Sequence, residues 1–246
     1  MRLLRSILPL FLCATVAAEP LTVAVASNFI RTAEELTAQF ARASGHEVRV
    51  SSASTGKLYA QISNGAPYGV LLAADAERPA RLEATGVGVA GTRFTYAIGR
   101  LVLWSADPAL SDADCRDQLD NLESMHLAIA NPQTAPYGAA AMQFLMRADV
   151  WNEAQDNLVY GENIAQTLHF VATGNANLGL IGASQAIDNR LPDASCRWTV
   201  PDSMHEPIEQ QAILIKDDDI GRAFLDFVRG PAGREIIRAH GYEVPD

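Results

Sequence analysis

Short apolar runs alternate along the chain with segments of helical spacing. The run at residues 21–26, LTVAVA, predicts a buried strand, and apolar positions three or four apart at residues 29–43 predict the helix that follows. Gly45 is typical of the residue that ends such a helix. The alternation continues with strands at 47–51 and 70–74 and helices at 56–63 and 76–84. This order indicates an α/β domain with a mainly parallel sheet.

A second series of the same kind follows a long predicted strand at residues 96–105. Gly99 interrupts that strand and favours a bend or a crossover between two lobes. Further strands are predicted at 126–130, 158–160, 178–181 and 208–215, and further helices at 138–147, 165–172, from Ser184, at 219–229 and at 232–240. We expect a first lobe of residues 19–97 plus 212–246 and a second lobe of residues 98–211.

The amino-terminal segment has the layout of a secretory signal peptide. Arg2 and Arg5 give a positive start, residues 7–16 are apolar, and small residues end the segment at Ala18. Cleavage there would remove residues 1–18 and place the mature chain in the periplasm. An uncut anchor and a lipoprotein acylated at Cys13 are the alternatives.

Composition narrows the classes of partner. The 246 residues are 48% hydrophobic and 20% charged, which suits a globular protein. Lys and Arg number 19 against 29 Asp and Glu, for a net charge of −10. Such a chain lacks the basic stripe that a nucleic acid needs, so we expect no nucleic-acid partner. A small anion is still possible, because uncharged dipoles can bind it locally.

Only Cys115 and Cys196 remain of the three cysteines once the signal peptide is removed. An even pair in an oxidising compartment favours one disulfide between them. Two separate buried thiols are the alternative.

Four predicted helices begin at polar or glycine-containing junctions directly after a strand. The junctions are Ser27-Asn28, Ser54-Thr55-Gly56, Pro136-Tyr137-Gly138 and Glu162-Asn163-Ile164. A helix start carries unpaired N–H groups and about half a positive charge. Several starts directed at one cleft would form an uncharged oxyanion site, with hydroxyl and amide groups as further donors. Taken one at a time, the same residues are ordinary helix caps.

Catalytic and metal-binding patterns are weak. The five histidines show no zinc spacing. Ser184 lacks the second glycine of a nucleophile elbow, so a secreted hydrolase that uses Ser184 is only a rival hypothesis. Lys57 lacks the upstream glycine of a phosphate-binding loop and is interpreted as a solvated lysine at a helix start. The acidic run Asp217–Asp219 is interpreted as a turn that caps the next helix.

The junctions also carry a resemblance to a known family, the periplasmic molybdate-binding proteins of ABC importers. The segments that resemble it, in the family's order, are LTVAVASNF at 21–29, SSASTGKLYAQISNGAP at 51–67, RFTYAIGRLVLW at 93–104, LAIANPQTAPYGAAA at 127–141, GENIAQTL at 161–168 and GPAGREIIRAHGY at 230–242. The resemblance implies a class II periplasmic solute-binding fold, in which hinge strands join two α/β lobes and the ligand lies in the cleft.

The resemblance also implies the ligand and the residues that hold it. Ser27 and Asn28 match the first anion loop, Thr55 the hydroxyl before a glycine, Tyr137 the third helix start, and Ile164 the fourth, where a backbone N–H is the donor. Molybdate, and tungstate with it, would be bound as an oxyanion, with no metal-cation ligands, no cofactor and no catalysis. A monomeric receptor would then deliver the ion to a membrane permease. A receptor for sulfate or phosphate is the alternative.

Two positions depart from the family pattern. Gly69 stands where the family usually has an acid, which could alter the cleft wall or the hinge side. Gly182 stands where some members have a tyrosine ligand, and Tyr137 could partly substitute for that contact.

Overall fold

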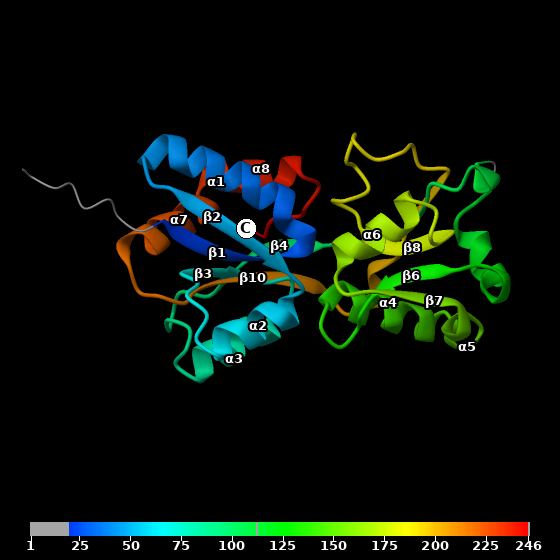
Figure 1. Cartoon of the computed structure of the whole chain (residues 1–246), viewed down its shortest axis with the longest axis horizontal. Coiled ribbons are helices and arrows are strands. Elements are labelled where there is room, and N and C mark those ends of the chain that lie inside the picture. Colours follow the sequence, from blue (N-terminus) through cyan, green and yellow to red (C-terminus); the bar gives the residue numbers. More distant parts are fainter. Residues whose placement is uncertain (1–19, 112, 246) are drawn as a thin grey trace, which may run out of the picture.

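The computed structural model describes residues 20–111 and 113–245. Two α/β lobes lie side by side, each built around a five-stranded sheet (Figure 1). The predicted signal peptide, including Cys13, lies outside the described residues. Within the described ranges, no helix is long and apolar enough to cross a membrane.

The first sheet has the strand order β2-β1-β3-β10-β4. Its strands are β1 (Leu21–Ala26), β2 (Val48–Ala53), β3 (Val70–Leu72), β4 (Phe94–Gly99) and β10 (Ile208–Leu214). The first three run parallel, and β10 runs antiparallel to both of its neighbours. One face packs against α1 (Ile30–Ser44), α7 (Asp219–Arg229) and α8 (Pro231–Ala239), and the other against α2 (Thr55–Ser63) and α3 (Glu77–Ala84). Gly45, with a φ of 75°, ends α1 as expected.

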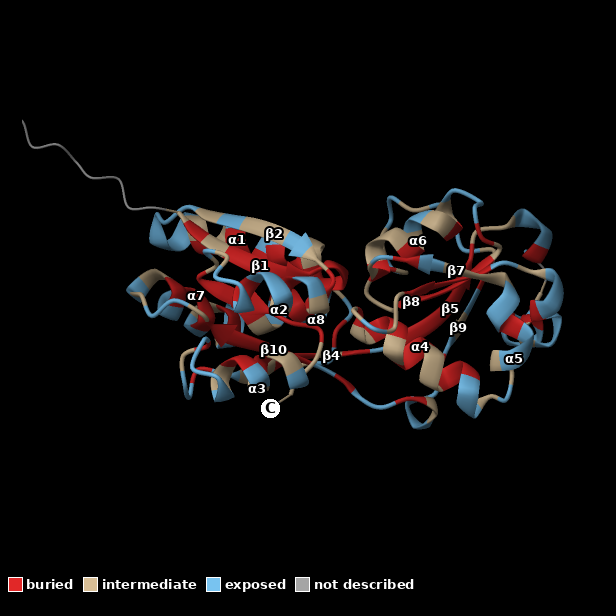
Figure 2. Ribbon diagram, turned by 60° about the horizontal axis from the view of Figure 1, so that its bottom comes forward, coloured by how far each residue is buried: buried red, intermediate tan, exposed pale blue. Residues whose placement is uncertain are grey.

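The second sheet repeats this plan in the order β7-β6-β8-β5-β9. Its strands are β5 (Leu101–Ser105), β6 (Leu127–Ala130), β7 (Leu158–Gly161), β8 (Leu178–Gly182) and β9 (Cys196–Thr199). The helices α4 (Pro136–Arg147) and α5 (Trp151–Ala154) cover one face and α6 (Ile164–Ala172) the other. Buried strands fill the centre of both lobes, with the exposed residues on the outer helices and loops (Figure 2).

The chain changes sheet next to Gly99. The predicted strand at 96–105 is two strands, β4 in the first sheet and β5 in the second, with Arg100 between them. The chain returns between β9 and β10, and residues 208–211 already pair with β4. Residues 98–99 and 208–211 therefore belong to the first sheet, although the predicted division gives them to the second lobe. Apolar pattern alone does not show with which sheet a strand end pairs.

Two elements of the second lobe differ from the sequence prediction. Residues 183–187 form turns and not a helix, because the Gln185 side chain accepts a hydrogen bond from the Gly182 N–H (3.0 Å) and ties the segment back to β8. The strand β9 was not predicted. It is a four-residue edge strand, CRWT, whose alternating exposure leaves little apolar signal.

The structure contains the predicted disulfide between Cys115 and Cys196. Cys196 is the first residue of β9, and Cys115 precedes the 3-10 helix η3 (Arg116–Ser124). The bridge therefore ties the edge strand β9 to the segment between β5 and β6, within the second lobe.

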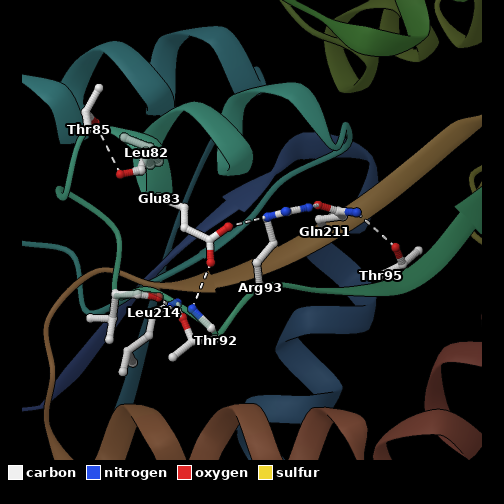
Figure 3. Close-up of polar contacts among 10 residues, drawn as sticks. Leu82, Glu83, Thr85, Thr92, Arg93, Thr95, Gln211 and Leu214 are labelled. Carbon is white, nitrogen blue, oxygen red and sulfur yellow. Dashed lines mark hydrogen bonds and ion pairs between the residues drawn. The ribbon is translucent and has the colours of Figure 1, made fainter.

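A polar network fixes the irregular part of β10 (Figure 3). The strand shifts register between Gln210 and Gln211. Arg93 donates to the Glu83 carboxylate (2.9 Å) and to Gln211 Oε1 (2.8 Å), and Gln211 Nε2 donates to Thr95 Oγ1 (3.1 Å). With Gln211 held in this way, its neighbour Gln210 is directed towards Asn28 in the loop after β1.

Candidate functional site

Four helix starts meet at one small buried cavity between the lobes. The cavity is narrow, with about 10 Å³ accessible to the centre of a water molecule. Its lining residues are Ala26, Ser27, Asn28, Ser54, Thr55, Ala74, Ala135, Pro136, Tyr137 and Ile164. All five residues predicted to bind the oxyanion are among them, so the structure brings them together. None of the lining residues carries a formal charge, which leaves dipoles and neutral donors to act on a ligand.

Ser27 and Asn28 lie in the short 3-10 helix η1 (Ser27–Phe29), directly after β1. No side chain caps this helix start. Asn28 Nδ2 donates to Gln210 Oε1 (2.7 Å) and to the Tyr242 hydroxyl (3.1 Å). Both side-chain N–H bonds of Asn28 are therefore used within the protein, and the donor that Asn28 can offer the cavity is its main-chain N–H.

Tyr242 supports this loop from the carboxyl-terminal segment. Its hydroxyl donates to the Asn28 carbonyl oxygen (2.8 Å) and accepts from Ser184 Oγ of the second lobe (2.8 Å). Burial raises the pKa of Tyr242 to about 12, although the hydrogen bonds from Ser184 and Asn28 oppose the shift. The hydroxyl therefore stays protonated at neutral pH. Sequence reasoning missed Gln210 and Tyr242, because they lie 182 and 214 positions from Asn28 and no local pattern marks them.

The start of α2 brings three consecutive residues to the cavity or its edge. Thr55 Oγ1 accepts from the Ala74 N–H (3.0 Å), so its own proton is free to be donated. The Gly56 N–H donates to the Thr134 carbonyl of the second lobe (2.8 Å). A Cβ atom at Gly56 would lie 2.9 Å from that oxygen, so the close approach of the lobes here requires glycine. The hydroxyl of Ser54 is buried without a partner.

Tyr137 lies in the first turn of α4, after Pro136. Its ring is buried, and burial raises the pKa of its hydroxyl well above 10. The side chain packs against two glycines: a Cβ atom at Gly182 would lie 3.3 Å from the ring, and one at Gly99 would overlap the hydroxyl. The ring therefore fills the space beside Gly182, where some relatives of the resembled family have a tyrosine.

Ile164 is the first residue of α6. The Asn163 side chain before it caps the next two N–H groups, those of Ala165 (3.0 Å) and Gln166 (3.1 Å). The N–H of Ile164 lies outside this cap. Gln185 Nε2 donates to the Ile164 carbonyl (3.2 Å) and so ties the helix start to the turn after β8.

Lys57 does not line the cavity. Its ammonium group bonds Glu162 of the second lobe (2.7 Å), and the two side chains are 46% and 67% exposed. The hydrogen bond and the charge of Lys57 lower the pKa of Glu162. Arg31 and Asp188 form a second ion pair between the lobes. The predicted solvated lysine is thus an exposed partner in a contact across the cleft.

Gly69 lies away from the cavity. Its N–H donates to the Thr22 carbonyl (2.9 Å), and a Cβ atom there would overlap the Leu21 side chain. Gly69 therefore sits beside the start of β1, at the opposite end of that strand from Ser27. Gly69 is therefore not part of the cavity lining.

The rival catalytic and metal sites find no support in the geometry. Ser184 donates to Tyr242, and no hydrogen bond in the described part of the chain joins it to a histidine. The described residues hold no group of three or more His, Cys, Asp or Glu side chains that could bind a metal ion. Asp218 caps α7 through the Gly221 N–H (2.7 Å), and Asp217 pairs with Arg222 (2.7 Å), as expected of a capping turn.

The chain matches known proteins over most of its length. Residues 21–243 match the family described as bacterial extracellular solute-binding protein. The molybdate-binding protein ModA of Azotobacter vinelandii is 45% identical over 236 residues, which are 95% of this chain and 93% of the relative. ModA of Rhodobacter capsulatus is 42% identical over 92% of this chain and 89% of its own length.

A solved structure confirms the fold. The periplasmic molybdate-binding protein of Azotobacter vinelandii superposes with a TM-score of 0.85 at 40% identity, over 92% of this chain and 100% of the other. This match confirms the predicted class II solute-binding fold with two α/β lobes. These relatives are binding proteins and not enzymes, as predicted for this chain. The chain therefore belongs to the bacterial extracellular solute-binding proteins and, within them, to the ModA family.

Proposed function

We propose that this protein is a periplasmic receptor that binds molybdate, and tungstate equally well, in the cavity between its lobes. The observation that carries the proposal is the meeting of four helix starts, from both lobes, at one buried cavity with a neutral lining. The names of the two ModA relatives support the choice of molybdate among the oxyanions.

The chemistry of the lining suits a fully deprotonated dianion. Main-chain N–H groups of Ser27, Asn28, Thr55 and Ile164 and the hydroxyls of Ser27 and Thr55 are donors, and helix starts add partial positive charge. Tyr137 lies in the first turn of α4 and contributes through the partial positive charge of that helix start. A ligand held in this way is surrounded by protein on both sides, so binding stabilises the closed arrangement of the lobes.

The remaining parts of the proposal concern transport. Residues 1–18 act as a signal peptide, and the mature chain works in the periplasm as a monomer with lobes divided near residue 100 and between residues 199 and 208. Molybdate is its cargo and not a cofactor. The closed receptor presents surfaces of both lobes to the permease of an ABC importer and delivers the ion there.

Isothermal titration of the purified, ligand-stripped protein with four oxyanions tests the proposal. Molybdate and tungstate should bind alike. Hydrogen phosphate carries a proton that would face a donor, so it should not bind detectably. Sulfate is smaller, and each buried donor that it leaves unpaired costs about 1–3 kcal/mol. Two such donors would weaken sulfate binding by roughly 30-fold to about 25,000-fold. Sulfate or phosphate binding as tightly as molybdate would assign the protein to another oxyanion.

A further inference from the structure

Ser54 has a buried hydroxyl with no partner at the edge of the ligand cavity. Four buried side-chain polar atoms among the described residues lack a hydrogen bond: Ser54 Oγ, Tyr137 Oη, His205 Nε2 and Gln210 Nε2. Of these four residues, only Ser54 and Tyr137 line the cavity. The Tyr137 hydroxyl packs against Gly99, at the passage between the lobes. Because the Oγ atom of serine lies only one bond from Cβ, the Ser54 hydroxyl must lie close to the cavity lining.

The position of Ser54 makes the free hydroxyl unusual. Ser54 is the N-cap residue of α2, where a serine normally accepts a hydrogen bond from an N–H of the first turn. Its side chain makes no such bond. The corresponding residues of two other helices do cap: Asn163 at α6 and Asp218 at α7. Ser54 is 2% exposed, so water does not replace the missing partner at the surface.

The neighbours of Ser54 explain why its hydroxyl has no hydrogen-bond partner within the protein. The Gly56 N–H, which a capping serine could have bound, donates to Thr134 across the cleft. Thr55 anchors the helix start to β3 by accepting from the Ala74 N–H. Leaving a buried hydroxyl unpaired costs free energy comparable to a lost hydrogen bond, and such groups in folded proteins usually have a role.

We infer that Ser54 donates its hydroxyl proton to the bound oxyanion and is a ligand in addition to Ser27, Asn28, Thr55, Tyr137 and Ile164. This inference rests on the proposed function. At the start of α2, Thr55 then both anchors the helix and donates to the ligand, whereas Ser54 forms a hydrogen bond with the ligand alone. A group that serves only the ligand contributes to affinity without stabilising the ligand-free fold.

The test compares Ser54→Ala with Ser52→Ala, a matched control on the exposed side of β2 two residues away. Titration with molybdate should show Ser54→Ala weaker by about tenfold or more, because a donor to a charged acceptor is lost. Ser52→Ala should bind like the wild type. Without ligand, the melting temperature of Ser54→Ala should equal or exceed that of the wild type, while the rise caused by molybdate should be smaller.

Two results would overturn the inference. The first is a smaller loss of affinity in Ser54→Ala while the wild type binds molybdate tightly. The second is a fall in the ligand-free melting temperature, which would show a structural role. If the wild type and Ser52→Ala bind none of the oxyanions, the proposed function itself fails and this inference fails with it.

Discussion

At the scale of single residues, Thr55 and Lys57 stand two positions apart and should affect binding very differently. Thr55 lines the cavity, and removal of a donor to a charged ligand costs about 1.5–3 kcal/mol. Thr55→Ala should therefore weaken molybdate binding roughly ten- to a hundredfold. Lys57 makes an exposed ion pair outside the cavity, so Lys57→Ala should weaken binding by about fivefold or less. Titration of the purified variants measures both.

Thr55→Ser is the control, because it keeps the hydroxyl and should keep most of the affinity. A greater loss in Lys57→Ala than in Thr55→Ala would contradict a site of neutral donors.

The sequence predicts some features of these residues and not others. The residues at the four junctions could be predicted, because a strand end followed by a polar helix start is a local pattern. The roles of their individual atoms could not. Asn28 uses its amide on Gln210 and Tyr242, and that role depends on a bulge in a strand 182 positions away. Ser54 was part of a predicted junction, yet only the packed structure shows that its hydroxyl has no partner.

At the scale of elements, α2 must approach the loop before α4 closely for the lobes to meet. Gly56→Ala would place a methyl group 2.9 Å from the Thr134 carbonyl oxygen. When the lobes are apart, the same change stabilises α2, since alanine in a helix is more favourable than glycine by about 0.5–1 kcal/mol of folding free energy. We expect molybdate affinity to fall while the ligand-free protein unfolds at an equal or higher urea concentration.

Paired titrations and urea unfolding curves would separate these two effects. Unchanged affinity in Gly56→Ala would show that the contact with Thr134 does not limit closure.

The disulfide also acts at the scale of elements. Its cysteines lie 81 positions apart, and closing such a loop is worth about 4 kcal/mol in the chain-entropy model. Reduction should therefore lower the melting temperature. Affinity at temperatures where the protein stays folded should not change, because both cysteines lie in the second lobe and leave the hinge free. Thiol labelling of the denatured, unreduced mature protein should find no free thiol, and two labelled cysteines would contradict the bridge.

The alternation of strands and helices let the sequence predict most elements, since each lobe repeats one local pattern. The turn after β8, the edge strand β9 and the splitting of the strand at 96–105 could not be predicted in this way. The edge strand β9 pairs with β5, and the strand at 96–105 changes sheet at Arg100, so both depend on partners that are distant along the chain. The turn after β8 depends on a local side-chain bond between Gln185 and the Gly182 N–H, which an apolar pattern does not reveal.

At the scale of the whole molecule, the ion pair between Lys57 and Glu162 couples lobe closure to pH. The hydrogen bond and charge of Lys57 lower the pKa of Glu162 from its usual 4.5. A lowered pKa means that the pair stabilises the closed form above about pH 4.5 and that this contribution is lost as the pH falls through the lower value. Lys57→Gln should return the pKa of Glu162 towards 4.5 in an NMR titration.

Asp217 provides the matched control. Its pKa is also lowered, by Arg222, but both residues belong to the first lobe. Lys57→Gln should leave the pKa of Asp217 where it is. An unchanged pKa of Glu162 in that variant would show that the pair across the cleft does not persist in solution.

The disulfide has a practical consequence for anyone who wishes to follow molybdate optically. With Cys115 and Cys196 joined and Cys13 in the predicted signal peptide, the mature chain offers no competing thiol to a maleimide dye. A single cysteine placed on the rim of the cleft, as in Glu162→Cys, would take the fluorophore at one defined position. The dye would be close to Lys57 when the lobes meet and in water when they part. The receptor is therefore a scaffold for a reagentless fluorescent sensor whose signal follows the concentration of the free oxyanion.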